Sequence, residues 1–188
     1  MQIESIMREI DRGGVVGLPT ETVFGLACTL DSKTGVEKLM RLKNRGIDSG
    51  KVFTLVPESV KNIPKYAILT EKSQKIIKKH LPGALTLILP KNPDFHHFYY
   101  DSFDSIGVRI PDFPLFDELL SKSGPLLLTS ANLRGGTPVK DAAELAETMP
   151  EVDYIVDLPA SNQSPSTIID FTRDVPKVLR QGNLKIRL

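Results

Sequence analysis

Apolar side chains recur at helical spacing at the start of the chain and then gather in short continuous runs. Ile3, Ile6 and Ile10 lie on one face of a predicted helix, and the glycines that follow are typical of a helix end. The next run, Val15–Leu18, predicts a short buried strand, and the polar residues after it predict a loop that continues to Leu26. We therefore expect the chain to open with a helix, a strand and a polar loop.

Two further helices have recognisable starts. Thr34, with Glu37 three residues later, has the form of a capping box, and the apolar spacing after it predicts a helix that ends near Lys43. Thr70 can cap another helix, which reaches Lys79. The other predicted elements are strands at Val52–Val56, Leu85–Leu89, Ser105–Ile110, Pro125–Thr129, Tyr154–Val156, Thr167–Phe171 and Val178–Leu179, and helices near Leu115–Leu120 and Ala142–Met149.

Predicted strands and helices interleave irregularly, and several strands follow one another without a helix between them. That order is typical of a mixed sheet rather than of a regular doubly wound one. A length of 188 residues with 40% apolar residues suffices for one substantial core. We predict an α/β fold with a twisted mixed β-sheet flanked by helices, in a single domain spanning residues 1–188.

Charge and cysteine content narrow the class of protein. The 24 basic and 23 acidic residues nearly cancel, so the overall charge does not indicate a nucleic-acid or membrane-surface protein, although a local basic groove is compatible with it. Cys28 is the single cysteine, which excludes an intramolecular disulfide and fits a reducing compartment. The charged N-terminal residues do not resemble a signal peptide, and no later run reaches membrane-spanning length. We expect a cytoplasmic protein without a membrane partner.

Two short polar motifs carry groups that suit phosphate. Lys43 and Arg45 are cations at a predicted helix exit, where both could face one anion. Ser130 and Asn132 follow a buried strand, where α/β folds commonly present ligand-binding groups. Each motif also has an ordinary interpretation, a solvated basic helix end for the first and a Ser/Asn turn for the second. Phosphate binding becomes the stronger interpretation only if the two act together.

Further candidates lie at other strand ends. The loop Thr20–Thr22 could hold an amino acid or organise a metal-bound water, and it could equally be a plain turn. Arg109 interrupts an apolar strand, so it is either exposed or paired with an anion such as a substrate carboxylate. Ser166 and Arg180 would lie at the edge of a pocket, with a turn and a surface arginine as the ordinary alternatives.

A series of short motifs, taken in order, resembles the YrdC-like family. Each motif is weak by itself, but the ordered set covers nearly the whole chain. The motifs are Pro-Thr-Glu-Thr-Val-Phe-Gly-Leu at 19–26, Lys-Asn-Arg at 43–45, Pro-Gly-Ala-Leu-Thr-Leu at 82–87, Gly-Val-Arg-Ile-Pro at 107–111, Ser-Ala-Asn at 130–132, Ser-Thr-Ile-Ile-Asp at 166–170 and Leu-Arg-Gln-Gly at 179–182. The resemblance implies a YrdC-like twisted mixed sheet with a concave substrate pocket.

The resemblance also implies an activity, the synthesis of threonylcarbamoyl-AMP for the threonylcarbamoyladenosine modification of tRNA. L-threonine, bicarbonate and ATP would give threonylcarbamoyl-AMP and pyrophosphate, through N-carboxylation of threonine and attack of the carbamate on the α-phosphorus. ATP would be a substrate and Mg²⁺ its expected metal, whose protein ligands the motifs leave unknown. Further partners would be tRNA or double-stranded RNA and downstream threonylcarbamoyl-transfer proteins.

Roles for individual positions follow from the same resemblance. Charge on the phosphates would be stabilised by a catalytic group of Lys43, Arg45, Ser130 and Asn132. Threonine would be bound by Thr22, Arg109 and Ser166, with Arg109 paired to its carboxylate. ATP would be bound by Lys43, Arg45, Lys51, Ser105, Ser130, Asn132 and Arg180.

The sequence departs from the family pattern in two places. After Arg45, the family's next cation is either Lys51, following a two-residue insertion, or is replaced by Ser49. After Asn132, the usual Ser-Gly and Ser-Pro-Thr elements are absent. Either Lys140 supplies a phosphate contact there or the loop lacks one.

Two other functions are compatible with the sequence. The segment Phe53–Leu55 resembles the YciO-like branch of the family, which lacks the Lys-x-Arg and Ser-x-Asn pairs that this chain keeps. The second is a nonenzymatic module that binds tRNA or double-stranded RNA; its binding would weaken steeply with salt and survive loss of Ser130 or Asn132. An enzyme would instead consume ATP in a threonine-dependent reaction.

Overall fold

The computed structural model describes residues 2–44, 52–133, 135–160 and 164–186. It begins with α1 (Gln2–Asp11), in which Ile3, Ile6 and Ile10 are buried, as the helical spacing predicts. Gly13 follows the helix with φ +80°, a conformation that glycine adopts at little cost, and its N–H donates to the Ile10 carbonyl over 3.0 Å. This turn leads directly into the first strand.

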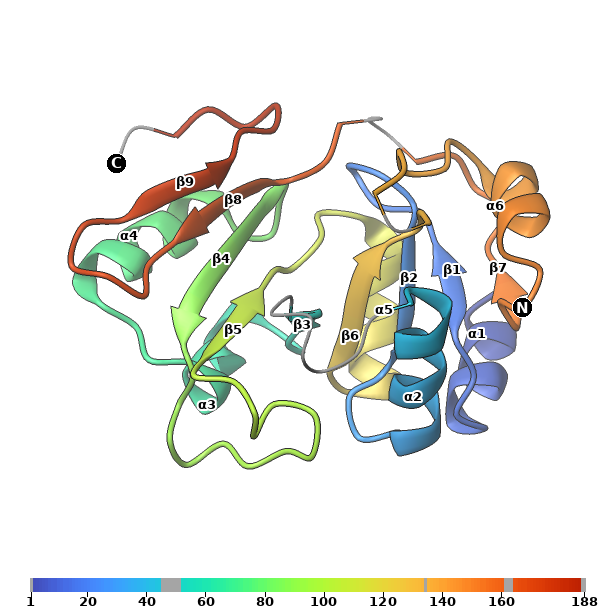
Figure 1. Ribbon diagram of the computed structural model, residues 1–188, viewed down its shortest axis with the longest axis horizontal. Coiled ribbons are helices and arrows are strands. Elements are labelled where there is room, and N and C mark those ends of the chain that lie inside the picture. Colours follow the sequence, from blue (N-terminus) through green and yellow to red (C-terminus); the bar gives the residue numbers. More distant parts are fainter. Residues whose placement is uncertain (1, 45–51, 134, 161–163, 187–188) are drawn as a thin grey trace.

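The strands of the described residues form one mixed sheet, in the order β7-β1-β2-β6-β3-β5-β4-β8-β9 (Figure 1). The pairs β1/β7, β3/β5 and β4/β8 are parallel, and the other neighbours are antiparallel. The predicted mixed sheet is therefore confirmed. The bounds are β1 Val16–Leu18, β2 Gly25–Thr29, β3 Thr54–Val56, β4 Leu85–Pro90, β5 Ser105–Val108, β6 Leu126–Ser130, β7 Tyr154–Ile155, β8 Thr167–Asp170 and β9 Lys177–Arg180.

Helices cover both faces of the half of the sheet that contains β1, β2 and β6. Side chains of α1 and α5 share one buried cluster with Ala27 of β2, and side chains of α2 and α6 share another with Leu26 and Cys28. Figure 1 shows α5 behind β6 and α2 in front of β2. The bounds of the remaining helices are α2 Lys33–Leu42, the short 3-10 helix η2 Val60–Asn62, α3 Ile63–Tyr66, α4 Glu71–His80, α5 Pro114–Ser123 and α6 Ala142–Thr148.

Strand β2 corrects the prediction of a loop that continues to Leu26. Its register pairs Leu26 with Gly17 of β1 on one side and with Thr129 of β6 on the other. Because β2 is buried on both faces, its residues show no alternation of apolar and polar side chains. Its glycine and alanine also have low strand propensity, so the local pattern gave little sign of a strand.

The start of α2 also differs from the predicted capping box at Thr34. Ser32 is the cap, and its Oγ accepts a hydrogen bond from the Gly35 N–H over 3.1 Å, while Thr34 lies inside the helix. The helix ends where predicted: the Lys43 N–H donates to the Leu39 carbonyl, and Asn44 then adopts φ +44°. This left-handed residue turns the chain away and leaves Lys43 at the exit of the helix.

The remaining predicted helices and strands are present with shifted ends, while η2 and α3 were not predicted. The irregular segment 91–104 supports β3, since the Tyr99 hydroxyl accepts from the Phe53 N–H over 3.0 Å and the Tyr100 hydroxyl donates to the Phe53 carbonyl over 2.9 Å. These bonds fix the residue that precedes Thr54 at the start of β3. Within the described ranges, no helix combines the length and apolar character needed to cross a membrane.

Candidate active site

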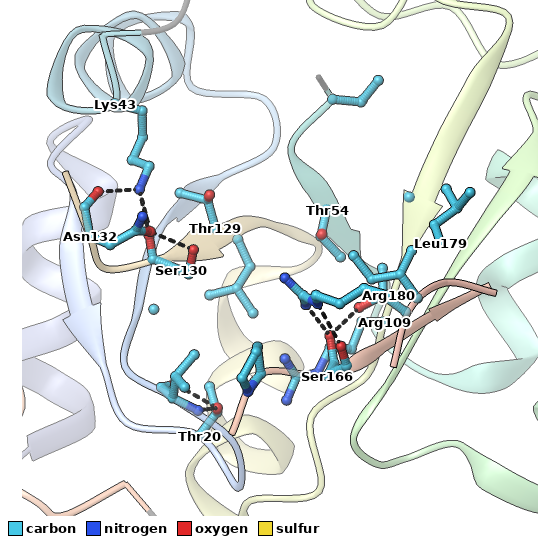
Figure 2. Close-up of a pocket in the computed structure, with 18 of the residues that line it drawn as sticks. Thr20, Lys43, Thr54, Arg109, Thr129, Ser130, Asn132, Ser166, Leu179 and Arg180 are labelled. Carbon is cyan, nitrogen blue, oxygen red and sulfur yellow. Dashed lines mark hydrogen bonds between the residues drawn. The ribbon is translucent and has the colours of Figure 1, made fainter. Parts of the chain in front are cut away.

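A cavity of about 660 Å³ lies at the middle of the sheet, and Figure 2 shows side chains from both halves of the chain around it. Alternate residues along and just beyond β5 line it, namely Ser105, Gly107 and Arg109, because successive strand residues face opposite sides of a sheet. Its volume lies in the range typical of small-molecule and cofactor sites, about 300–1,000 Å³. The cavity is therefore large enough for a nucleotide-sized ligand.

One wall is organised by Lys43 at the exit of α2. Lys43 is only 4% exposed, and its Nζ donates to the Ser130 carbonyl over 2.8 Å, to Asn132 Oδ1 over 2.8 Å and to the Asn132 carbonyl. A lysine ammonium has three donors, so these three oxygens of one turn match its donor capacity. The two motifs that are far apart in sequence thus form one unit, which Figure 2 shows.

Asn132 completes the hydrogen bonding of this wall. Its Oδ1 also accepts from the Ser130 hydroxyl over 2.6 Å, and its Nδ2 donates to the carbonyls of Leu133 and Gly136 over 2.8 and 2.9 Å. Both polar atoms of the amide are therefore engaged with the protein. They fix the turn after β6, which carries the Ser130 hydroxyl to the cavity.

The opposite wall is built around Ser166, just before β8. Its Oγ lies 2.8 Å from the Thr86 Oγ1 of β4 and accepts from Arg180 Nη2 of β9 over 3.1 Å. Arg180 Nε also donates to the Ser166 carbonyl over 2.9 Å. Both contacts from Arg180 are drawn in Figure 2. Three neighbouring strands therefore bring two hydroxyls and a guanidinium to the same place.

Gly182, two residues after Arg180, lies where two backbone segments pack too closely for a side chain. A Cβ at Gly182 would lie 2.2 Å from the Pro165 carbonyl oxygen and 2.8 Å from the Thr167 nitrogen, which no side chain can tolerate. The Gly182 N–H also donates to Thr167 Oγ1 over 3.0 Å. The close approach of these two backbone segments holds Arg180 beside Ser166.

Arg109 is the second guanidinium of the cavity, and it is buried. Its Nη2 donates to Thr22 Oγ1 over 2.6 Å and lies 2.9 Å from Glu21 Oε1. The contact with Glu21 does not have hydrogen-bond geometry. Both carboxylate oxygens, and also Arg109 Nε, have no hydrogen-bond partner among the described residues. We therefore describe it as an ion pair held by charge.

The charge of the cavity favours an anion. Partial burial, followed by the nearby positive charge of Arg109, lowers the pKa of the Arg180 guanidinium from its ordinary value. Among the described residues, the lining includes Lys43, Arg109 and Arg180 but no aspartate or glutamate. Two guanidiniums that line the same partly enclosed space are stabilised when a negative ligand lies between them.

Thr20 and Thr22 form a tight hydroxyl turn between β1 and β2. Thr20 Oγ1 donates to the Val23 carbonyl over 2.7 Å and accepts from the Thr22 and Val23 N–H groups over 3.1 and 3.2 Å. The Thr20 and Thr22 hydroxyls are also 2.9 Å apart. This turn presents Thr20 to the cavity and directs Thr22 toward Arg109.

Most residues that the sequence analysis singled out meet at the cavity. Thr22 is not among the lining residues: it is 1% exposed and contacts Arg109. Arg45, Ser49 and Lys51 lie outside the described residues, and Lys140 is exposed away from the lining. The predicted residues that line the cavity are Lys43, Ser105, Arg109, Ser130, Asn132, Ser166 and Arg180.

Three threonines of the lining were missed by sequence reasoning. Thr54, Thr86 and Thr129 lie in strands β3, β4 and β6 and contribute to the cavity. Threonine is common in strands because its branched side chain suits a pleated surface, so a strand threonine carries no functional signal of its own. Thr86 lies inside a quoted motif, but only the contact with Ser166 reveals its place.

The described residues do not provide a protein cage for a metal. No group of three or more His, Cys, Asp or Glu side chains is placed to hold an ion in these parts of the chain. Mg²⁺ commonly binds through substrate phosphates and water together with one or two carboxylates. The described lining contains no carboxylate for such an ion.

Comparison with known proteins identifies the family of the chain. A Sua5/YciO/YrdC family model, described as telomere recombination, matches residues 8–182. The threonylcarbamoyl-AMP synthase of Klebsiella pneumoniae is 34% identical over 176 residues, which cover 89% of this chain and 89% of that protein. The similarity to the synthase thus extends over most of both proteins.

Solved structures give the same result. The chain matches P. abyssi Sua5 in complex with L-threonine at 28% identity and a TM-score of 0.87, over 97% of this chain and 54% of that one, so it spans about half of the Sua5 length. It matches E. coli YciO at 27% identity and a TM-score of 0.87, over 97% of this chain and 89% of that one. The motifs, the sheet and the family match agree, and the chain belongs to the Sua5/YciO/YrdC family.

Proposed function

We propose that this protein is a threonylcarbamoyl-AMP synthase, an enzyme that makes threonylcarbamoyl-AMP and pyrophosphate from L-threonine, bicarbonate and ATP. The observation that carries the proposal is the arrangement of the two walls. The unit of Lys43, Ser130 and Asn132 faces the pair of Ser166 and Arg180 across one cavity without a lining carboxylate among the described residues. Relatives named as this synthase, and a Sua5 structure that contains L-threonine, support the same assignment.

The wall around Lys43 suits the phosphates of ATP. Lys43 would exchange one of its oxygen partners for a phosphate oxygen, and the Ser130 hydroxyl and Asn132 amide would hold the surrounding turn in place. Arg45 and Lys51 would add positive charge from the segment after α2. Ser105 and Arg180 complete the proposed nucleotide contacts.

The region around Arg109 suits the amino acid. Arg109 would pair with the carboxylate of L-threonine, while Ser166 offers a hydroxyl to the same substrate. Thr22 would act on the substrate through Arg109, because its hydroxyl already accepts from Nη2. The guanidinium of Arg180 lines the same cavity, and the positive charge of Arg109 contributes to the lowering of its pKa.

The chemistry asks the protein mainly for positioning and charge. The threonine nitrogen forms a bond to the bicarbonate carbon while the C–OH bond of bicarbonate breaks. The hydroxide leaves with a proton from the nitrogen as water, which gives a carbamate. A carbamate oxygen then attacks the α-phosphorus, and the bond to pyrophosphate breaks with its electrons leaving on the pyrophosphate oxygen. Fixed cations stabilise the charge that develops on those oxygens, and alignment of the reactants supplies most of the remaining rate gain.

The remaining parts of the proposal concern the metal and the partners. Mg²⁺ would enter as the MgATP complex, since the described lining has hydroxyls but no carboxylate. The product would pass to transfer proteins that modify tRNA in the cytoplasm, and the chain could contact tRNA or double-stranded RNA during that step. These partners follow from the proposed reaction.

Pyrophosphate release is the test of this function. The purified chain is incubated with ATP, Mg²⁺ and bicarbonate, with and without L-threonine. We expect threonine-dependent release that falls about 10²-fold to 10³-fold in Lys43→Ala and in Ser130→Ala, because each change removes a group that orders the phosphate wall. Matched controls on the exposed side of α5, Lys122→Ala and Ser121→Ala, should keep wild-type turnover.

The same assay separates the enzyme from its alternatives. Well-folded wild-type protein that releases no pyrophosphate would contradict the synthase and favour the YciO-like branch. Salt-sensitive RNA binding that survives both substitutions, without threonine-dependent turnover, would instead indicate an RNA-binding module.

A further inference from the structure

Glu21 is a buried carboxylate beside the cavity whose role is not explained by the proposed contacts to substrates. Its side chain is 15% exposed and that of Arg109 is 8% exposed, and their closest atoms are 2.9 Å apart. Both carboxylate oxygens are enclosed by protein and have no hydrogen-bond partner among the described residues. Burying a charge in this way costs free energy unless an opposite charge lies beside it. The role of Glu21 therefore depends on its partner, Arg109.

The partner, Arg109, is held on one side only. Its Nη2 faces both Thr22 Oγ1 at 2.6 Å and Glu21 Oε1 at 2.9 Å, and its Nε is enclosed without a partner. Its Nη1 makes no hydrogen bond to the described residues and is not one of the enclosed atoms, and Arg109 lines the cavity. These two contacts at Nη2 orient the planar guanidinium. Nη1 is then available to bind a ligand.

Electrostatic repulsion explains why Arg109 needs these contacts. Arg109 and Arg180 line the same cavity, and the positive charge of Arg109 contributes, after burial, to the lowered pKa of Arg180. Repulsion of this kind would turn a flexible arginine away from the site. The Glu21 carboxylate beside Arg109 offsets that repulsion and keeps the guanidinium in its binding orientation before the substrate arrives.

We propose that Glu21 is a positioning residue that, together with Thr22, fixes the Arg109 guanidinium for the carboxylate of the amino-acid substrate. The inference rests on the proposed function, because it takes L-threonine as that substrate. Glu21 acts through Arg109 and does not touch the substrate, since both of its oxygens are enclosed. Its removal should therefore weaken the binding of a carboxylate and leave the binding of ATP unchanged.

The test compares Glu21→Ala and Glu21→Gln with the wild type. We expect Glu21→Ala to raise KM for L-threonine at least 10-fold without changing KM for ATP. Glu21→Gln keeps an oxygen that can accept from Nη2 and should show a smaller increase. Glu118→Gln, which changes an exposed carboxylate on α5, is the matched control and should keep both KM values.

A double-mutant cycle shows whether Glu21 works through Arg109. If it does, Glu21→Ala combined with Arg109→Ala should weaken threonine binding no more than Arg109→Ala alone. L-threoninol, which lacks the carboxylate, should bind the wild type and Glu21→Ala equally. Additive effects, or an equal loss of threoninol binding, would overturn the proposal.

Direct binding separates this inference from the proposed function. Calorimetry with L-threonine measures affinity without turnover, so weakened binding in Glu21→Ala supports the inference even if the wild type releases no pyrophosphate. Absence of L-threonine binding to the wild type, or an unchanged affinity in a folded Glu21→Ala protein, overturns it. If Glu21→Ala does not fold, Thr22→Val removes the other contact to Nη2, and an unchanged affinity in that variant overturns the proposal instead.

Discussion

Asn132 shows how one side chain can hold a site together. Its amide joins Lys43 and Ser130 to the turn after β6. Asn132→Ala leaves these groups without their partner, so we expect stability to fall by about 1–3 kcal/mol. Turnover should fall about 10²-fold or more, because Lys43 and Ser130 lose their fixed positions. Thermal unfolding and pyrophosphate release measure the two effects on the same protein.

Asn92 offers a control for that change. Its amide also makes two hydrogen bonds, to the Pro64 carbonyl over 2.9 Å and from the Asp94 N–H over 3.0 Å, but in an exposed loop away from the cavity. Asn92→Ala should cost some stability and leave turnover intact. Equal losses of turnover in the two variants would show that loss of activity only follows loss of stability.

Residue identities of the site were predictable only in part from the sequence. The cations and the Ser-x-Asn motif could be named as candidates because such groups at helix and strand ends suit phosphate, although each also has an ordinary structural interpretation. Thr54 and Thr86 gave no such signal, because threonine fits any strand. The ion pair of Glu21 with Arg109 joins residues far apart in the chain, which a local pattern does not reveal.

At the scale of elements, the cap of α2 should contribute to the stability of the protein. Ser32 accepts from the Gly35 N–H, so Ser32→Ala should destabilise the protein by about 1 kcal/mol. Thr34→Ala, inside the first turn, should change stability much less. Urea unfolding of both variants decides between Ser32 and Thr34 as the cap, and a larger loss for Thr34→Ala would contradict the assignment.

The segment 91–104 should make stability depend on pH. Burial lowers the pKa of His97 from its ordinary value of 6.5, against the opposing effects of the Leu30 carbonyl, Asp31 and Asp101. A histidine with a lowered pKa in the folded state binds its proton more readily when unfolded. Its contribution to stability is therefore present above about pH 6.5 and is lost as the pH falls toward the pKa of the folded state.

Urea unfolding from about pH 7.5 to about pH 5.5 measures that dependence. His97 Nδ1 accepts from the Tyr99 N–H over 3.2 Å, so protonation of Nδ1 would also break this bond. We expect the loss of stability on acidification to be smaller in His97→Gln than in the wild type. An identical pH dependence in the two proteins would assign the acid sensitivity to other groups.

Elements were predictable where their periodicity was clear and their caps were local. The isoleucine spacing of α1 and the Thr70 cap of α4 were predicted and are both present in the structure. The same reasoning did not predict β2, because a strand buried on both faces shows no alternation of apolar and polar side chains. The cap of α2 was predicted at Thr34 but is Ser32, because the contact to the Gly35 N–H is set only in the folded chain.

At the scale of the whole molecule, a ligand in the cavity joins distant parts of the chain. ATP at about 100 times its Kd should stabilise the fold by about 2.7 kcal/mol, since it binds only the folded state. For a protein of this size that corresponds to a rise in Tm of about 5–10 °C. Thermal unfolding with and without ligands measures it.

Arg180 tests whether both walls contribute to that stabilisation. Arg180→Ala removes the contacts to Ser166 that link β9 to the segment before β8, so the rise in Tm at the same ligand concentration should shrink. The same rise in the variant and the wild type would place the ligand on the Lys43 side alone.

The order of the strands was beyond sequence reasoning for a different reason. The sheet places β6 between β2 and β3, although the chain between β3 and β6 contains two other strands. Such pairings depend on which surfaces complement one another after folding, and local periodicity carries no information about them. The mixed class of the sheet was predictable from the irregular succession of elements, whereas the neighbours were not.

The position of β9 has a consequence for how the protein loses activity. In the described residues β9 ends the strand order, its register with β8 shifts at Ile168, and Leu179 is 53% exposed. Edge strands with few buried contacts open locally at a lower free energy than the core of a sheet. Arg180 would then separate from Ser166 while the rest of the sheet stays folded, and activity would be lost before the protein unfolds. A bound ligand would keep β9 paired with β8.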